Sequence, residues 1–137
     1  MSKLHHLACT PENVHWGYLD ANLPPALRVE SGDRVSMECI SGGPEVVPKS
    51  GFEILPDYAA IHAAHKRTIG PHILTGPVYV EGAEPGDVLE IWIHEVRLRQ
   101  DWGYNTINPL GGTIPEDFPI QRSLIIPIER NAMVATL

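Results

Sequence analysis

The stretch EPGDVLEIWIHEVRL, residues 84–98, decides the predicted fold class because it joins a tight turn to a long apolar alternation. Its Pro-Gly-Asp sequence is typical of a β-turn, with proline at the second position and glycine at the third. The residues that follow are apolar on both alternating faces, with Leu89 and Ile91 on one and Trp92 on the other. We therefore predict a long central strand over Val88–Leu98, covered on both faces, in an all-β protein.

A similar turn-and-strand pattern occurs earlier in the chain. The run Ser-Gly-Asp at residues 31–33 predicts a tight turn, because glycine tolerates positive φ and aspartate bonds to nearby backbone. Alternating residues flank it over 26–30 and 34–40, and another short strand is expected over 78–81. The likeness between this turn and the one at 85–87 predicts two β-hairpins rather than a repeat, because the pattern does not occur a third time.

The sequence pattern of the remaining chain predicts one helix and two long loops. Helical spacing of apolar residues predicts the helix over 57–67. Glycine and proline are frequent over 41–56 and 99–122, which indicates loops, the second of them long enough to be functional or to wrap another body. A last strand is expected over 123–129, and Pro127 within it lacks an amide donor, which favours an edge position.

The composition indicates a globular protein of 137 residues, 43% hydrophobic and 20% charged, that forms one domain over residues 1–137. We expect an all-β fold, a β-sandwich or open barrel of short strands with one short helix. The net charge of −7 and the lack of a basic stripe argue against nucleic-acid and membrane partners. No membrane-length apolar run or signal peptide is visible, so a cytoplasmic location is expected. Cys9 and Cys39 are expected to be thiols rather than a disulfide.

Candidate catalytic residues gather in one rigid stretch of the second half. Glu81 follows a predicted strand and precedes a glycine, so its carboxylate is delivered by a strand end with room around it. His72 and Thr75 lie in the preceding extended segment, which two Gly-Pro pairs bound. We expect Glu81 to face a cleft that it shares with His72 and Thr75, whereas Glu84 and Asp87 form the turn. From spacing alone, a structural role for Glu81 stays equally open.

The seven histidines suggest a metal site, although their spacing alone does not define one. His62 and His65 share a face of the predicted helix without a third ligand nearby, and partly exposed surface histidines explain them more simply. His94 is expected to be a packed strand residue. The neighbours His5 and His6 point to opposite sides of an extended chain, so at most one of them enters any site. Motifs for a nucleophilic serine, a phosphate loop or a copper centre are absent from the sequence.

The run GPHILTGPVYVEGAEPGDVLE, residues 70–90, closely resembles the signature segment of the acetamidase/formamidase family. Segments within 5–33, 101–105 and 110–118 are similar to its opening and middle, so the resemblance covers about residues 5–137. The family comprises metal-associated amidohydrolases that act on short linear amides and are built largely of β-structure. Its members are considerably longer, so the resemblance implies an N-terminal half without the C-terminal half that completes the active site.

This resemblance implies metal-dependent hydrolysis of short linear amides, with a divalent metal ion, zinc or calcium, that polarises the carbonyl or activates a water. It makes Glu81 a candidate base or metal partner, His72 a ligand or oxyanion donor, Thr75 a substrate hydrogen-bonder and His6 a metal ligand. The expected partners are a small amide, the missing C-terminal half or a second chain, and further copies in a homo-oligomer. This chain alone is expected to be inactive. The alternative is a non-catalytic β-sandwich subunit or fragment that acts as a structural partner.

Overall fold

Strands predominate in the computed structural model, which describes residues 2–137. Among these residues the one α-helix is α1, Pro56–Ala64, so the predicted all-β class with one short helix is confirmed. The chain divides into two units. Unit 1 comprises the residues up to Gly43 together with Pro56–Trp92, and unit 2 comprises Pro44–Leu55 and Ile93–Leu137. No helix within residues 2–137 is long and apolar enough to cross a membrane.

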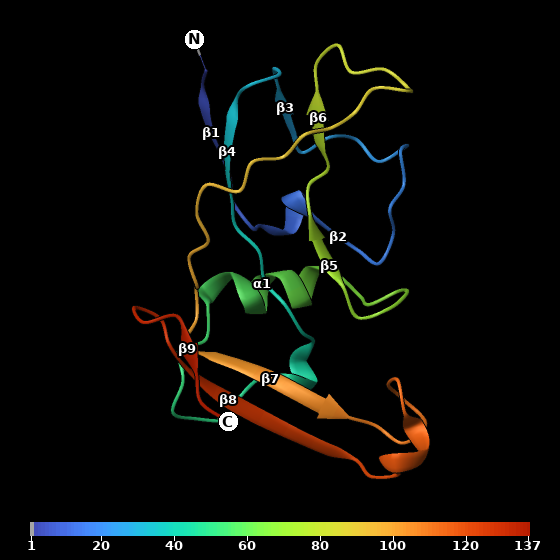
Figure 1. The fold of residues 1–137 in the computed structure, drawn as a ribbon, viewed down its shortest axis with the longest axis vertical. Helices are drawn as coiled ribbons and strands as arrows, with labels where there is room; N and C mark the ends of the chain where they lie inside the picture. The colour runs from blue at the N-terminus through green and yellow to red at the C-terminus, as the bar shows by residue number, and fades with distance from the viewer. Residues whose placement is uncertain (1) are drawn as a thin grey trace. The chain divides into compact units, whose positions relative to one another are not determined.

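Unit 1 is built from three separate pairs of short strands (Figure 1). The first and fourth strands pair in parallel, as do the third and the sixth, whereas the second and fifth pair antiparallel. These strands are β1 (Leu4–Leu7), β2 (Val14–Trp16), β3 (Leu27–Val29), β4 (Arg34–Met37), β5 (Ile73–Thr75) and β6 (Val78–Val80). Three of them, β3, β4 and β6, confirm strands that alternation predicts.

Both predicted turns form, but the predicted hairpins do not. The Asp33 amide donates to the Glu30 carbonyl at 3.1 Å, and the Asp87 amide donates to the Glu84 carbonyl at the same distance. The strands that flank the first turn nevertheless pair elsewhere, β3 with β6 and β4 with β1. The hairpin prediction is wrong because turn residues fix the local path of the chain, whereas strand edges here are paired by distant segments.

Helix α1 lies in unit 1 and buries one face, as its spacing predicts. Pro56 occupies its first position, where a missing amide hydrogen costs no intrahelical bond. Tyr58 and Ile61 are buried, and the Tyr58 hydroxyl donates to two glycine carbonyls at 2.7 and 3.1 Å. The helix ends at Ala64, three residues before the predicted end. The two cysteines of the chain are thiols, as expected, the first buried and the second exposed.

Unit 2 contains an antiparallel sheet in the order β7-β8-β9, drawn in orange and red in Figure 1. Its strands are β7 (Trp102–Ile107), β8 (Arg122–Glu129) and β9 (Val134–Ala135). Strand β8 confirms the predicted strand over 123–129, whereas β7 lies within the predicted loop. The Trp102 side chain is 1% exposed, and its indole N–H donates to the Glu53 carbonyl at 2.9 Å. This tryptophan is therefore the core residue that fixes the loop segment of unit 2 to the sheet.

The predicted edge position of Pro127 is wrong, because β8 has a neighbour on each side. On the side that faces β7, the amide of the next residue, Ile128, donates to the Asp101 carbonyl at 2.8 Å. The ladder with β7 therefore does not need an amide hydrogen from Pro127. Pro127 supplies its carbonyl, which accepts the Thr136 amide at 3.2 Å. A proline is tolerated here because β9 is only two residues long.

Residues 88–98, called the apolar segment below, form no strand and appear as plain coil in Figure 1. The prediction of a covered central strand is therefore wrong. Val88 is 93% exposed, Ile93 is 79% exposed and Trp92 is 73% exposed. Alternation makes a segment competent to form a strand, but a ladder also needs a partner strand. Within residues 2–137 no strand pairs with this segment.

Candidate functional site

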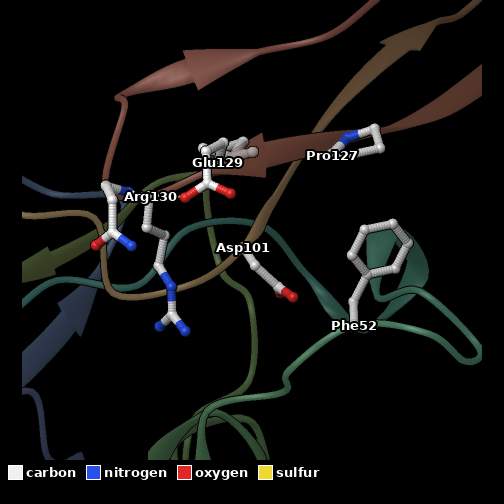
Figure 2. Close-up of a pocket in the computed structure, with 7 residues that line it drawn as sticks. Phe52, Asp101, Pro127, Glu129 and Arg130 are labelled. Carbon is white, nitrogen blue, oxygen red and sulfur yellow. Dashed lines mark hydrogen bonds between the residues drawn. The ribbon is translucent and has the colours of Figure 1, made fainter.

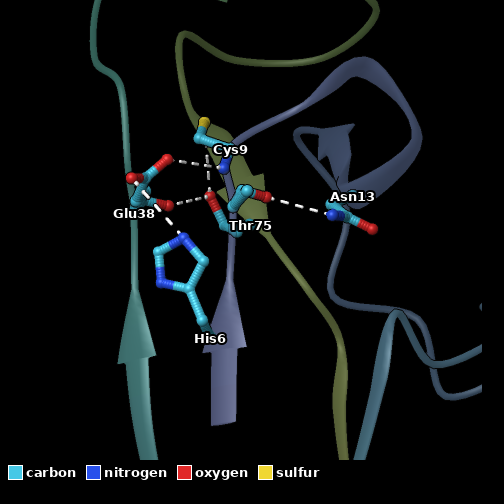
Figure 3. A network of polar contacts seen from close by, with 6 residues as sticks. His6, Cys9, Asn13, Glu38 and Thr75 are labelled. Atoms are coloured by element: carbon cyan, nitrogen blue, oxygen red, sulfur yellow. Dashed lines mark hydrogen bonds and ion pairs between the residues drawn. The ribbon is translucent and has the colours of Figure 1, made fainter.

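Two predicted site residues of unit 1, His6 and Thr75, lie beside Glu38 (Figure 3): His6 faces its carboxylate, and Thr75 contacts its backbone carbonyl. His6 lies on β1, Thr75 ends β5, and Glu38 directly follows β4. The His6 Nε2 atom lies 3.7 Å from Oε1 of Glu38, and the Cys9 amide donates to its Oε2 at 3.3 Å. Strand pairing thus gathers residues that are far apart in sequence.

Backbone pairing explains why Glu38 is held in place. Strands β1 and β4 run parallel, and beyond their ladder the Glu38 amide donates to the Leu7 carbonyl at 3.0 Å. The Thr75 hydroxyl donates to the Glu38 carbonyl at 2.9 Å and lies 3.7 Å from the Sγ atom of Cys9. Since its proton is engaged by a backbone carbonyl, Thr75 positions Glu38 and keeps its own oxygen available as an acceptor.

The His6–Glu38 pair is held by backbone groups and is partly exposed. The His6 side chain is 59% exposed and the Glu38 side chain 33% exposed. Such a pair can exchange protons with a bound molecule, or it can offer one nitrogen and one oxygen to a metal ion. Residues 2–137 contain no group of three or more His, Cys, Asp or Glu residues that could hold a metal ion. The described residues therefore do not form a metal site by themselves.

Glu81 lies in a different part of unit 1. Its Oε1 accepts a hydrogen bond from Nη1 of Arg28 at 3.0 Å, and that guanidinium lies 4.3 Å from the centre of the Tyr79 ring. The structure does not bring Glu81 to His72 or Thr75. The pocket beside it, of about 150 Å³, is lined by Lys3, His5, Arg28, Val29, Glu30, Asp33 and Glu81.

His72 belongs to neither of these groups. It is exposed in the loop before β5, and its carbonyl accepts the Gly17 amide at 3.0 Å. The catalytic roles assigned to Glu81, His72 and Thr75 from the sequence stay predictions. Of the four predicted site residues, the structure brings together His6 and Thr75 and adds Glu38, which sequence reasoning did not single out.

Asp33, predicted only as a turn residue, also anchors the first strand. Its Oδ1 accepts the Lys3 amide at 2.8 Å, and its Oδ2 lies 2.8 Å from Nε2 of His5. The Asp33 side chain is only 5% exposed. The Lys3 amide, and after it the hydrogen bond with His5, lower the pKa of Asp33 from 3.8 to about 2. These bonds favour the ionised carboxylate in the folded protein.

The lowered pKa of Asp33 predicts an acid-sensitive contribution to stability. The contribution is complete above about pH 4 and is lost as the pH falls toward 2, because the unfolded state then binds the proton first. The measurement is the urea concentration at the midpoint of unfolding, which we expect to fall between pH 5 and pH 2. We expect this fall to be smaller in Asp33→Asn than in the unchanged protein. Asp87→Asn, in the similar turn, is the matched control. A fall as steep in Asp33→Asn as in the unchanged protein would contradict the assignment.

A second, wider pocket lies within unit 2 (Figure 2). It encloses about 430 Å³ and is lined by Phe52, Asp101 and residues 127–131. Its charged groups already bind within the unit: Asp101 accepts the Glu53 amide at 3.0 Å, and Nη2 of Arg130 lies 3.0 Å from Oε2 of Glu53. These bonds give the charges a structural role in holding a loop segment against the sheet.

Comparison with known proteins identifies the family of this chain. The family model described as acetamidase/formamidase matches residues 6–133, a range that includes His6, Glu38 and Thr75. The chain belongs to the acetamidase/formamidase family. The match covers more than nine-tenths of the chain and confirms the resemblance seen in the sequence.

Two curated relatives of this acetamidase/formamidase chain carry formamidase names. A candidate formamidase of Schizosaccharomyces pombe is 30% identical over 113 residues, which are 79% of this chain and 26% of that protein. The formamidase of Methylophilus methylotrophus is 31% identical over 103 residues, which are 72% of this chain and 24% of that enzyme. The chain therefore spans about a quarter of the length of either relative. No solved structure matches it.

Proposed function

We propose that this chain contributes the His6–Glu38 pair to the hydrolysis of short linear amides such as formamide and acetamide. The family match over residues 6–133 is the observation that carries the proposal, because it spans both members of the pair. The pair's geometry supports it, since the histidine nitrogen and the carboxylate oxygen lie 3.7 Å apart and both side chains are partly exposed.

In the proposed reaction, water attacks the amide carbonyl carbon and the C–N bond then breaks. The Glu38 carboxylate accepts a proton from the attacking water, and the His6 side chain, in its imidazolium form, donates a proton to the departing nitrogen. The products are a carboxylic acid and ammonia or an amine, and proton transfer from Glu38 to His6 restores both groups. Thr75 and the Cys9 amide hold Glu38 in position during these steps.

A divalent metal ion, zinc or calcium, is the cofactor that the family resemblance implies. The described residues do not complete a site for it, so no step above is assigned to a metal. We propose the metal-ligand role of His6 as an alternative to its role as proton donor, because a ligating imidazole nitrogen carries no proton. A polypeptide beyond this chain would then have to supply the remaining ligands. When bound, the ion would polarise the amide carbonyl.

A structural role is the second candidate function. The exposed side chains of the apolar segment favour a chain that supports a partner polypeptide. In that case catalysis would belong to the partner, and the His6–Glu38 pair would serve the fold of unit 1.

Complementation separates these two functions. The probe is the part of the M. methylotrophus formamidase that this chain does not match. We expect no release of ammonia from formamide or acetamide by either polypeptide alone, and release far above their sum from the mixture. A chimera, in which residues 6–133 replace the matched stretch of that formamidase, controls for weak association. An inactive mixture together with a folded but inactive chimera would refute the catalytic role.

A further inference from the structure

The apolar segment has the alternating apolar sequence of a strand but lacks a ladder. Within residues 2–137, no backbone–backbone hydrogen bond outside regular elements involves residues 88–98. The Arg97 guanidinium binds both carboxylate oxygens of Glu95, with Nε–Oε1 at 2.6 Å and Nη2–Oε2 at 2.8 Å. This ion pair joins two side chains of the segment and engages none of its backbone groups. The backbone N–H and C=O groups of the segment therefore have no backbone partner among the described residues.

The side chains of the segment require cover on both faces. Leu89, Ile91 and Ile93 alternate with Val88 and Trp92, and these side chains are between 70% and 93% exposed. A strand with apolar residues on both faces is stable only as a central strand between two covering layers. Unpaired edges and exposed apolar surface of this kind are sites where another polypeptide adds a strand.

A second copy of this chain does not fit that requirement. A second copy could pair its own residues 88–98 with one edge of the segment. It would not supply layers to cover the two apolar faces. Each copy also carries a net charge of −7, which opposes self-association. In each curated relative, in contrast, the part that this chain does not match is about three times as long as the matched stretch. Their additional polypeptide is large enough to supply both a neighbouring strand and covering layers.

We propose that residues 88–98 are a docking strand for the part of an acetamidase/formamidase-family polypeptide that this chain does not match. Backbone hydrogen bonds to a strand of that polypeptide provide affinity, and the two apolar faces provide its register. The inference goes beyond amide hydrolysis, since strand pairing is measurable without any turnover.

Hydrogen exchange tests the pairing directly. The chain is mixed with the unmatched part of the M. methylotrophus formamidase, and amide exchange of residues 88–98 is followed by mass spectrometry. We expect a one-to-one complex by light scattering and exchange at least about 10-fold slower in the segment than in the chain alone. A complex without protection of this segment, or no complex at all, would overturn the proposal.

Charge substitutions in the segment provide the matched variants. Ile91→Lys and Trp92→Lys place a charge on opposite faces, and each is expected to weaken binding at least about 10-fold. Both residues are 73% exposed, so the chain's own melting temperature should stay unchanged. The control is Leu19→Lys, which alters a residue that is 94% exposed outside the segment. Equal weakening by the control would refute the assignment.

Two other outcomes are distinguishable. Concentration-dependent protection of residues 88–98 in the chain alone would identify a second copy as the occupant and would overturn the proposal. A protected complex that releases no ammonia would support the docking strand and would count against the proposed function.

Discussion

Glu38→Gln is expected to lower kcat/KM for formamide by about 10²- to 10⁴-fold, the usual contribution of a positioned acid–base group. The measurement uses the chimera that carries residues 6–133. Glutamine has nearly the same shape as glutamate and keeps an oxygen that can accept the Cys9 amide, but it cannot take a proton from water. The fold should therefore be retained while the proton transfer is lost.

The matched variant is Glu81→Gln in the same chimera. The sequence makes Glu81 the candidate base, whereas the structure pairs it with Arg28 at 3.0 Å. If the His6–Glu38 pair carries the reaction, Glu81→Gln keeps turnover within a few fold of the unchanged chimera. Loss of activity in Glu81→Gln with normal turnover in Glu38→Gln would reverse the assignment. Circular dichroism on both variants shows whether either loss comes from unfolding.

Trp102→Ala is expected to destabilise the protein by about 3–5 kcal/mol, measured as the free energy of unfolding in urea. The Trp102 side chain is 1% exposed, and removing it leaves a cavity beneath the sheet of unit 2. The substitution also leaves the Glu53 carbonyl without the indole donor that binds it at 2.9 Å.

Trp92→Ala is the control for that experiment, because it makes the same chemical change in the apolar segment. Trp92 is 73% exposed, so its replacement should change stability by less than about 0.5 kcal/mol. Similar losses in the two variants would show that Trp102 is not the core residue that the structure indicates.

Much of the local structure could be predicted from the sequence because it depends on short-range chemistry. The Ser-Gly-Asp turn at 31–33, strand β8 and the buried face of α1 follow from residue types and spacing. Strand pairing could not be predicted in this way. The parallel pairs of unit 1 join segments that share no turn, and the alternation over 88–98 does not reveal whether a partner strand is present.

The candidate site shows the same limit. His6 and Thr75 could be named from the family resemblance, but no spacing motif joins either residue to Glu38. Alternation places Glu38 on the polar face with Arg34 and Ser36, which is also the pattern of a solvated strand surface. Only the β1–β4 pairing, which sets Leu7 beside Met37, reveals that Glu38 follows directly beyond the ladder and near His6.

The distant strand pairs of unit 1 also determine when it can fold. Strand β1 pairs with β4, which follows it by about 30 residues. Strands β2 and β3 pair with β5 and β6, which follow them by about 50 to 60 residues. Closing loops of this length before any ladder forms makes folding slow for a chain of this size. On the ribosome, β2 stays unpaired until residue 75 has emerged, and β3 stays unpaired until residue 80 has emerged. The nascent chain therefore exposes open strand edges for most of its synthesis, the stage at which aggregation competes with folding.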